Sequence, residues 1–193
     1  ESVDKRMEVV RVDPTTGDVL DRIPLHAGWA HTIVTADGRL VVYEAGDEAV
    51  NVGGHLASVD PETGGLTQAE IPSKYFEGGP VVWRGEVWAA AEDGFASFDP
   101  VTAEVIEGSP ELDPSRYASC CGFVEADDRG IWFVGFDCKM GGGERRLDLF
   151  DPSTGEVMEL VAPGKGTPVA MAVAPDAAWI LNYEGTLTHV DLG

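Results

Sequence analysis

A six-residue turn motif recurs along this chain and limits its fold more than any other feature. It runs hydrophobic residue, Asp, Pro, any residue, Thr and Gly, as in Val12-Asp13-Pro14-Thr15-Thr16-Gly17. Proline fixes φ at the first turn position, the aspartate side chain accepts hydrogen bonds from later backbone NH groups, and glycine adopts positive φ. Three further copies and a shortened copy place the anchor aspartates at Asp13, Asp60, Asp99, Asp151 and Asp191.

The spacing of these anchors predicts a β-propeller. Successive anchors lie 47, 39, 52 and 40 residues apart, and a period in the forties with strand-like sequence is typical of propeller blades. In each repeat a strand ends at the anchor, another follows the turn, and a hairpin completes the unit. We therefore expect an all-β chain of four-stranded antiparallel blades, in which the Asp-Pro turn joins the third strand to the fourth.

Turn residues and one aromatic position mark the hairpin of each repeat. Turns are expected at 37–38, 84–85, 128–130 and 175–176, and Pro or Gly interrupts every window long enough for a helix. The second hairpin strand carries Trp88, Trp132 and Trp179 at one position, which Val41 or Val42 takes in the first repeat.

Both ends of the sequence have the pattern of a third strand, which gives about seventeen strands and about four blades. Two third strands do not complete one blade, so we expect residues 1–193 to be part of a larger propeller ring. The alternative is a closed four-bladed propeller with a redundant edge strand.

The repeat resembles a loose superfamily of bacterial propellers. Copies such as Phe150-Asp151-Pro152-Ser153-Thr154-Gly155, followed by an Asp-Gly hairpin and a Trp-bearing strand, are similar to YVTN, NHL, PQQ-type and streptogramin-lyase-like repeats. The resemblance covers nearly the whole chain and implies the propeller fold. It does not choose a function, because such repeats occur in enzymes, sensors and scaffolds alike.

The charge of the chain limits its partners. Its 193 residues carry 34 acidic against 13 basic side chains, a net charge of −21. Nucleic acid and anionic membrane surfaces require a basic footprint, so neither is an expected partner. No apolar run reaches the length of a transmembrane helix, so membrane insertion is not expected. An acidic surface attracts cations and basic partners.

The face opposite the Asp-Pro turns is the predicted binding face. The connections on that face vary in length and contain the insertions 46–54, 109–119 and 138–146. Function concentrates in long variable loops on a rigid scaffold. A protein or small-molecule ligand is expected there, contacting Trp29, His55, Tyr75, Glu77, Arg116, Tyr117 and Lys139.

Four acidic residues follow the second strands of the predicted blades at matching places. They are Asp47, Glu92, Asp137 and Glu184. Converging carboxylates suit Ca²⁺ or Mg²⁺, which prefer oxygen ligands. Acidic residues beside glycine are also ordinary turn residues, so no cofactor is assigned from this pattern.

His26 and His31 flank Trp29 at the entrance to an inner strand. Imidazoles on one face can bind a metal or act as acid and base, which makes these two histidines the candidate catalytic residues. Their spacing matches no zinc signature. The relatives that use a quinone or a metal would place His31, Trp29 and Arg116 at such a site.

Three cysteines lie in one repeat. A hairpin turn centred on Arg129 would place Cys120 opposite Cys138, within reach of a disulfide, with Cys121 as the competitor if the register slips by one. A disulfide indicates an oxidising compartment. The predicted location is therefore extracellular, periplasmic or at the cell surface; three reduced thiols are the alternative.

These patterns favour a non-catalytic, exported binding, interaction or sensor module. No nucleophile elbow, His-Glu-x-x-His motif or catalytic acid pair is present in the sequence. The alternative is a propeller enzyme of the streptogramin-lyase or quinone-dependent dehydrogenase kind, with a metal- or cofactor-assisted site at the channel mouth.

Overall fold

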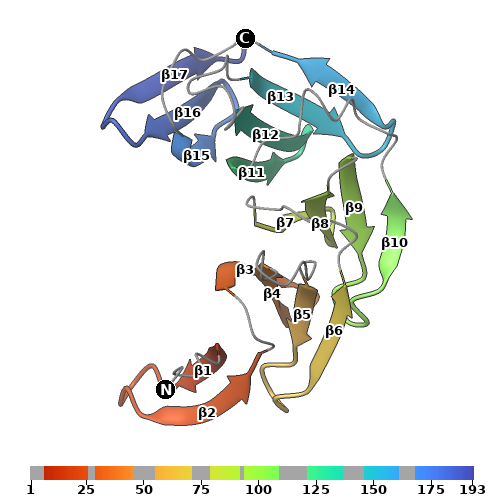
Figure 1. Ribbon diagram of the computed structural model, residues 1–193, viewed down its shortest axis with the longest axis vertical. Helices are drawn as coiled ribbons and strands as arrows, with labels where there is room; N and C mark the ends of the chain where they lie inside the picture. Colours follow the sequence, from red (N-terminus) through yellow and green to blue (C-terminus); the bar gives the residue numbers. More distant parts are fainter. Residues whose placement is uncertain are drawn as a thin grey trace, which may run out of the picture.

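Five antiparallel sheets make up the described part of the computed structural model (Figure 1), which covers residues 7–25, 29–45, 55–70, 79–91, 94–108, 121–136, 146–160 and 168–193. The first sheet has β1 (Glu8–Val12) and β2 (Val19–Pro24). The second has β3 (Trp29–Ala36), β4 (Arg39–Ala45), β5 (His55–Val59) and β6 (Leu66–Glu70). The third has β7 (Val81–Trp83), β8 (Glu86–Ala91), β9 (Gly94–Phe98) and β10 (Val105–Gly108). The fourth has β11 (Cys121–Asp127), β12 (Gly130–Phe136), β13 (Arg146–Asp151) and β14 (Glu156–Glu159), and the fifth has β15 (Pro168–Val173), β16 (Ala177–Asn182) and β17 (Leu187–Asp191).

The sheets follow one another along an open arc, with the first sheet at one end and the fifth at the other (Figure 1). Strands β3, β7, β11 and β15 line the inner side of the arc, and β6, β10 and β14 lie on its outer side. This arrangement is that of a β-propeller, and the expected all-β fold and strand order are confirmed, with seventeen strands among the described residues. Within the described residues, no apolar helix of membrane-crossing length occurs.

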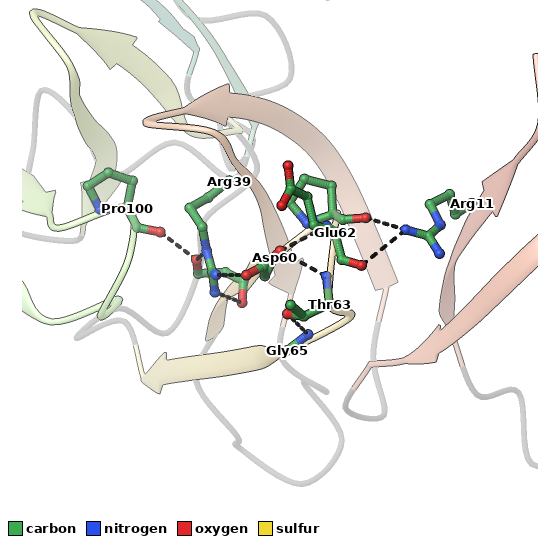
Figure 2. Close-up of polar contacts among 9 residues, drawn as sticks. Arg11, Arg39, Asp60, Glu62, Thr63, Gly65 and Pro100 are labelled. Carbon is green, nitrogen blue, oxygen red and sulfur yellow. Dashed lines mark hydrogen bonds and ion pairs between the residues drawn. The ribbon is translucent and has the colours of Figure 1, made fainter.

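Each Asp-Pro motif forms the same turn between a third and a fourth strand. At Asp60, Oδ1 accepts hydrogen bonds from the backbone NH of Glu62 at 2.8 Å and of Thr63 at 3.0 Å (Figure 2). The carbonyl of Asp60 accepts a hydrogen bond from the NH of Gly64, which has a φ of +73°. These NH donors stabilise the ionised carboxylate, and they lower the pKa of Asp60, with the Thr63 bond as the largest cause.

Polar side chains tie neighbouring sheets together on the side of the Asp-Pro turns. Arg11 of β1 donates a 2.6 Å hydrogen bond to the carbonyl of Pro61 in the next sheet's turn (Figure 2). Ser58 of β5 accepts a hydrogen bond from Arg39 at 3.0 Å and donates one to the carbonyl of Pro100, in the third sheet. The turns are therefore both the ends of their own sheets and the points where consecutive sheets meet.

The core lies between the sheets. Successive side chains of a strand point to opposite faces of its sheet, and both faces of an interior sheet are covered by neighbouring sheets. Trp88 of β8 packs against Ile131, Phe133 and Phe150 of the fourth sheet. Trp132 of β12 packs in the same way against the fifth sheet. The predicted aromatic position thus forms the centre of the inter-sheet contacts, and Val41 is its equivalent in the second sheet, since it pairs with Ser58, two residues before Asp60.

The hairpin turns form at the predicted places, with one correction to the register. Asp37 and Gly38 both have positive φ, as do Arg84 and Gly85, which is the geometry of a two-residue hairpin turn. In the fourth sheet Asp127 pairs with Gly130, so the turn is centred between residues 128 and 129 and not on Arg129. Cys121 consequently pairs with Phe136. The expected turn centre at Arg129 was therefore wrong, because the turn has two residues instead of three. Cys120 and Cys138 lie outside the described residues.

Candidate binding groove

A groove of about 530 Å³ opens along the inner strands of the second, third and fourth sheets. We call it the inner-strand groove. Its walls are mostly aliphatic, with two threonines and one carboxylate. The lining residues are Thr32, Ile33, Val34, Thr35, Leu40, Pro80, Val81, Val82, Val124, Glu125 and Ala126.

Alternation along β3 presents side chains to this groove. Ile33 and Thr35 are exposed on one face of the strand, whereas Val34 packs against the core cluster between the second and third sheets. Ile33 is 53% exposed, although it lies in the middle of the strand. An exposed aliphatic residue on a concave wall is available to contact an apolar ligand.

Gly79 sets the close approach between β3 and the segment that leads into β7. A Cβ atom added at Gly79 would lie 2.0 Å from Oγ1 of Thr32 and 2.2 Å from its Cβ. Any larger residue would displace Thr32, whose branched side chain has few alternative rotamers. The absence of a side chain at position 79 therefore fixes one wall of the groove.

Among the described residues, Glu125 is the one ionisable residue that lines the groove. It lies on β11 opposite Trp132 and its side chain reaches solvent. The surrounding apolar groups displace part of its hydration, and this burial raises the pKa of Glu125 above its ordinary value. An aliphatic wall with a single carboxylate suits an apolar molecule that carries a cationic or hydrogen-bond-donating group.

Most residues predicted to form the ligand face lie outside the described residues, namely Tyr75, Glu77, Arg116, Tyr117 and Lys139. The candidate catalytic residue His26 also lies outside them. The backbone of Trp29 begins β3 and pairs with Ala45, and His31 follows in the same strand. The side chains of Trp29 and His31 lie outside the described part of the structure. His55 begins β5 as a half-buried residue, in register with Glu44 and Glu70.

The predicted acidic ring is not assembled by the described residues. Glu184 is exposed in the turn between β16 and β17, and Asp47, Glu92 and Asp137 lie outside the described residues. Within the described ranges, no group of three His, Cys, Asp or Glu side chains has the geometry to hold a metal ion. Cys120 and Cys138 also lie outside these ranges, so their disulfide stays a prediction.

Glu44 is a buried acid that the sequence pattern did not single out. It is 2% exposed on β4, and its Oε1 accepts a 2.9 Å hydrogen bond from the side-chain amide of Gln68. Its Oε2 has no hydrogen-bond partner within the described ranges. Glu44 lies three residues after the aromatic position of its sheet, and Asn182 occupies the same place in the fifth sheet, where it donates to Thr186 and Thr188.

The inner-strand groove was also missed from sequence. Its residues come from three repeats, and none belongs to a motif. The available signal was the run Thr32-Ile33-Val34-Thr35, in which Thr35 takes a place that is aliphatic in the other inner strands, as at Val82, Ala126 and Val173.

Comparison with solved structures finds other propellers. The chain is 15% identical to the extracellular domain of the one-component system BT4673 from B. thetaiotaomicron (TM-score 0.52), over 83% of this chain and 22% of that one. It is 14% identical to the calcium-binding protein regucalcin from Agrobacterium tumefaciens (TM-score 0.57), over 85% of this chain and 54% of that one. It is 13% identical to the Dos1 propeller (TM-score 0.58), over 94% of this chain and 48% of that one.

The chain therefore spans about half or less of the length of these structures. No protein-family model matches the sequence. No curated protein matches it either. At such low identity the structural likeness concerns the fold alone, and that fold is the β-propeller.

Proposed function

We propose that this chain is a non-catalytic binding module whose inner-strand groove takes an apolar ligand bearing a protonated amine. The observation that carries the proposal is Glu125, the one carboxylate among the described residues that line a mostly aliphatic groove of about 530 Å³. A carboxylate in partly apolar surroundings binds a cation more strongly than one in open water, because the effective dielectric constant is lower. The net charge of −21 adds a field that attracts cationic ligands.

The module would act as an exported sensor or interaction domain with repeats of the YVTN, NHL or PQQ type. The similarity to an extracellular domain of a one-component system supports such a role. So does a strongly acidic surface, which favours solubility. The loop residues Trp29, His55, Tyr75, Glu77, Arg116, Tyr117 and Lys139 would contact a second part of the ligand or a protein partner.

A divalent cation at the loop face is a separate proposal. Asp47, Glu92, Asp137 and Glu184 would supply oxygen ligands for Ca²⁺ or Mg²⁺, and one structural neighbour is described as a calcium-binding protein. Thermal unfolding with and without millimolar calcium tests it. An unchanged midpoint, together with an unchanged midpoint in magnesium, would remove the cation site from the proposal.

The groove proposal is tested by calorimetric titration with two matched probes. 1-Naphthylmethylamine carries an apolar ring and a protonated amine, and 1-naphthylmethanol has the same ring without the charge. The amine is expected to bind about tenfold or more tightly than the alcohol, which corresponds to one charge-assisted hydrogen bond. In Glu125→Gln this preference should disappear while the alcohol still binds; an unchanged preference would refute the assignment of Glu125.

The enzyme alternative rests on His26 and His31. Mass analysis of the purified protein for a bound metal or quinone separates the two functions. A stoichiometric metal or quinone that is lost in His31→Ala would favour the enzyme and overturn the proposed binding role.

A further inference from the structure

One face of the fifth sheet repeats the pattern of the interior sheets, but no other described sheet covers it. The aromatic residues Trp88, Trp132 and Trp179 pair with Ser97, Leu149 and His189, and each of these partners lies two residues before an anchor aspartate. The three tryptophans therefore occupy one structural position. Trp88 and Trp132 are 2% exposed, whereas Trp179 is 41% exposed.

The neighbours of Trp179 are exposed on the same side. The register of β15, β16 and β17 puts six residues on this face, which we call the Trp179 face: Ala170, Ala172, Trp179, Leu181, Leu187 and His189. All six are exposed. The opposite face of the same sheet is buried, with Met171, Ala178 and Ile180 packed on Trp132.

The fourth sheet shows what covers such a face. Its equivalent residues are Phe123, Glu125, Trp132, Val134, Leu147 and Leu149. Glu125 is exposed, and the other five pack against the first two strands of the fifth sheet. Trp88 is covered likewise by residues of the fourth sheet, including Ile131 and Phe133 of β12. In both cases the cover is the next blade along the arc.

The outer edge of the fifth sheet also differs from the outer edges of the three preceding sheets. Strands β6, β10 and β14 each pair with the third strand of their own sheet. Strand β17, the third strand of the fifth sheet, pairs only with β16 among the described residues. The Trp179 face carries no acidic or Lys or Arg side chain, although the chain as a whole has a net charge of −21.

We propose that the Trp179 face is an inter-blade interface that is covered by one further propeller blade of the same polypeptide. The strand that leads into this blade would pair with β17 as the fourth strand of the fifth sheet. This blade would lay its first two strands, with small or aliphatic side chains, over Trp179. A second copy fits less well, because its first described strands, β1 and β2, are a third and a fourth strand and supply no such hairpin. The matched propellers are about twice or more as long as the aligned part of this chain. This inference does not depend on the proposed function.

The test extends the chain with its own repeat. In the first extended protein, residues 1–190 are joined to a second copy of residues 151–193. An Asp-Pro turn, a fourth strand and another copy of the fifth sheet then continue from β17. A second extension uses residues 99–151 instead, which contain β11 and β12, the strands of the sheet that covers Trp88. The fluorescence of Trp179 is the emission of each protein minus that of its Trp179→Phe variant. The quenching of this difference signal by acrylamide is compared between the extended proteins and the original chain.

Quenching of Trp179 is expected to fall in at least one extended protein to the level of Trp132. Trp179→Ser should then lower the unfolding midpoint of the extended protein and leave that of the original chain unchanged. Quenching that stays as strong in both extensions as in the original chain would overturn the proposal. A dimer of the original chain, seen by light scattering and lost in Trp179→Ser, would also overturn it, since the occupant would then be a second copy.

Discussion

The backbone NH of Ala103 donates a 2.8 Å hydrogen bond to the carbonyl of Asp99, and Ala103 holds a φ of +59° to do so. The other three complete turns have glycine at this position. One copy of the repeat therefore tolerates a left-handed alanine, which glycine adopts without steric cost.

This difference predicts unequal effects of two reciprocal substitutions. Gly17→Ala should destabilise the protein by about 1–2 kcal/mol, because an added Cβ meets no atom and only the backbone conformation is penalised. Ala103→Gly should be near neutral, since relief of a similar strain offsets the loss of a buried methyl group, about 0.8 kcal/mol. Urea unfolding measures both, and equal destabilisation would contradict this account of the turn.

Acid should weaken the Asp-Pro turns. Hydrogen bonds from the NH groups of Thr102 and Val101 lower the pKa of Asp99. A folded-state pKa below the unfolded one means that the stabilisation is complete above the unfolded pKa and is lost as the pH falls through the folded pKa. Below about pH 4, the unfolding midpoint of the native protein should therefore fall more steeply than that of Asp99→Asn.

Asp176→Asn is the charge-matched control, because Asp176 lies outside the Asp-Pro turns. This substitution removes one negative charge, and the unfolding midpoint of the variant should fall with decreasing pH as steeply as that of the native protein. If Asp99→Asn and the native protein follow the same profile between pH 5 and pH 2, the turn carboxylate does not act as described.

Arg129 is expected to be the strongest single polar link between two sheets. It donates 2.9 Å hydrogen bonds to the carbonyls of Ala174 and Pro175 in the next sheet, pairs with Asp127, and lies over the Trp132 ring at 4.6 Å. Arg129→Ala should cost about 2 kcal/mol, the scale of a charged hydrogen bond with its partners left unpaired.

A matched ion pair gives the comparison for Arg129. Arg22 pairs with Glu8 at 2.7 Å, but its side chain is 59% exposed. Arg22→Ala should cost less than about 1 kcal/mol, because exposed pairs contribute little. Equal losses for the two arginines in denaturant titrations would show that the inter-sheet hydrogen bonds of Arg129 contribute nothing extra.

The groove wall depends on Gly79. Gly79→Ala should destabilise the protein by roughly 1–3 kcal/mol, the cost of overpacking, because its Cβ would overlap Thr32. Thr32→Ser removes one of the three overlapping atoms, the Cγ2 methyl, and frees the rotation of the remaining hydroxymethyl group, so it should recover part of the loss in the double variant. A Gly79→Ala protein with native stability would contradict the close approach of these two segments.

The repeat made the fold predictable. The Asp-Pro anchors carry their own turn chemistry, so Asp60 and Asp99 locate the ends of third strands without any tertiary information. The tryptophan position was also visible, because Trp88 and Trp132 recur at one place in the repeat. What the sequence did not reveal was the two-residue turn at Asp128 and Arg129, since the next residue, Gly130, made a three-residue turn equally plausible.

The candidate site was less predictable for a physical reason. A groove made by three neighbouring strands depends on inter-sheet distances, and these follow from packing rather than from any local motif. Gly79 illustrates the problem: it reads as a linker residue beside Pro80, although its function in the fold is to let Thr32 approach. Glu125 likewise looks like an exposed charge in a strand until its apolar surroundings are known.

Hydrogen–deuterium exchange of the native protein with 1-naphthylmethylamine tests the binding claim most directly, because it locates the ligand as well as detecting it. The predicted result is slower exchange in the segments 32–35, 80–82 and 124–126, which line the groove, and weaker protection of the same segments in Glu125→Gln. Protection confined to other segments, or no protection at a saturating concentration of the amine, would contradict the proposal that the inner-strand groove is the binding site.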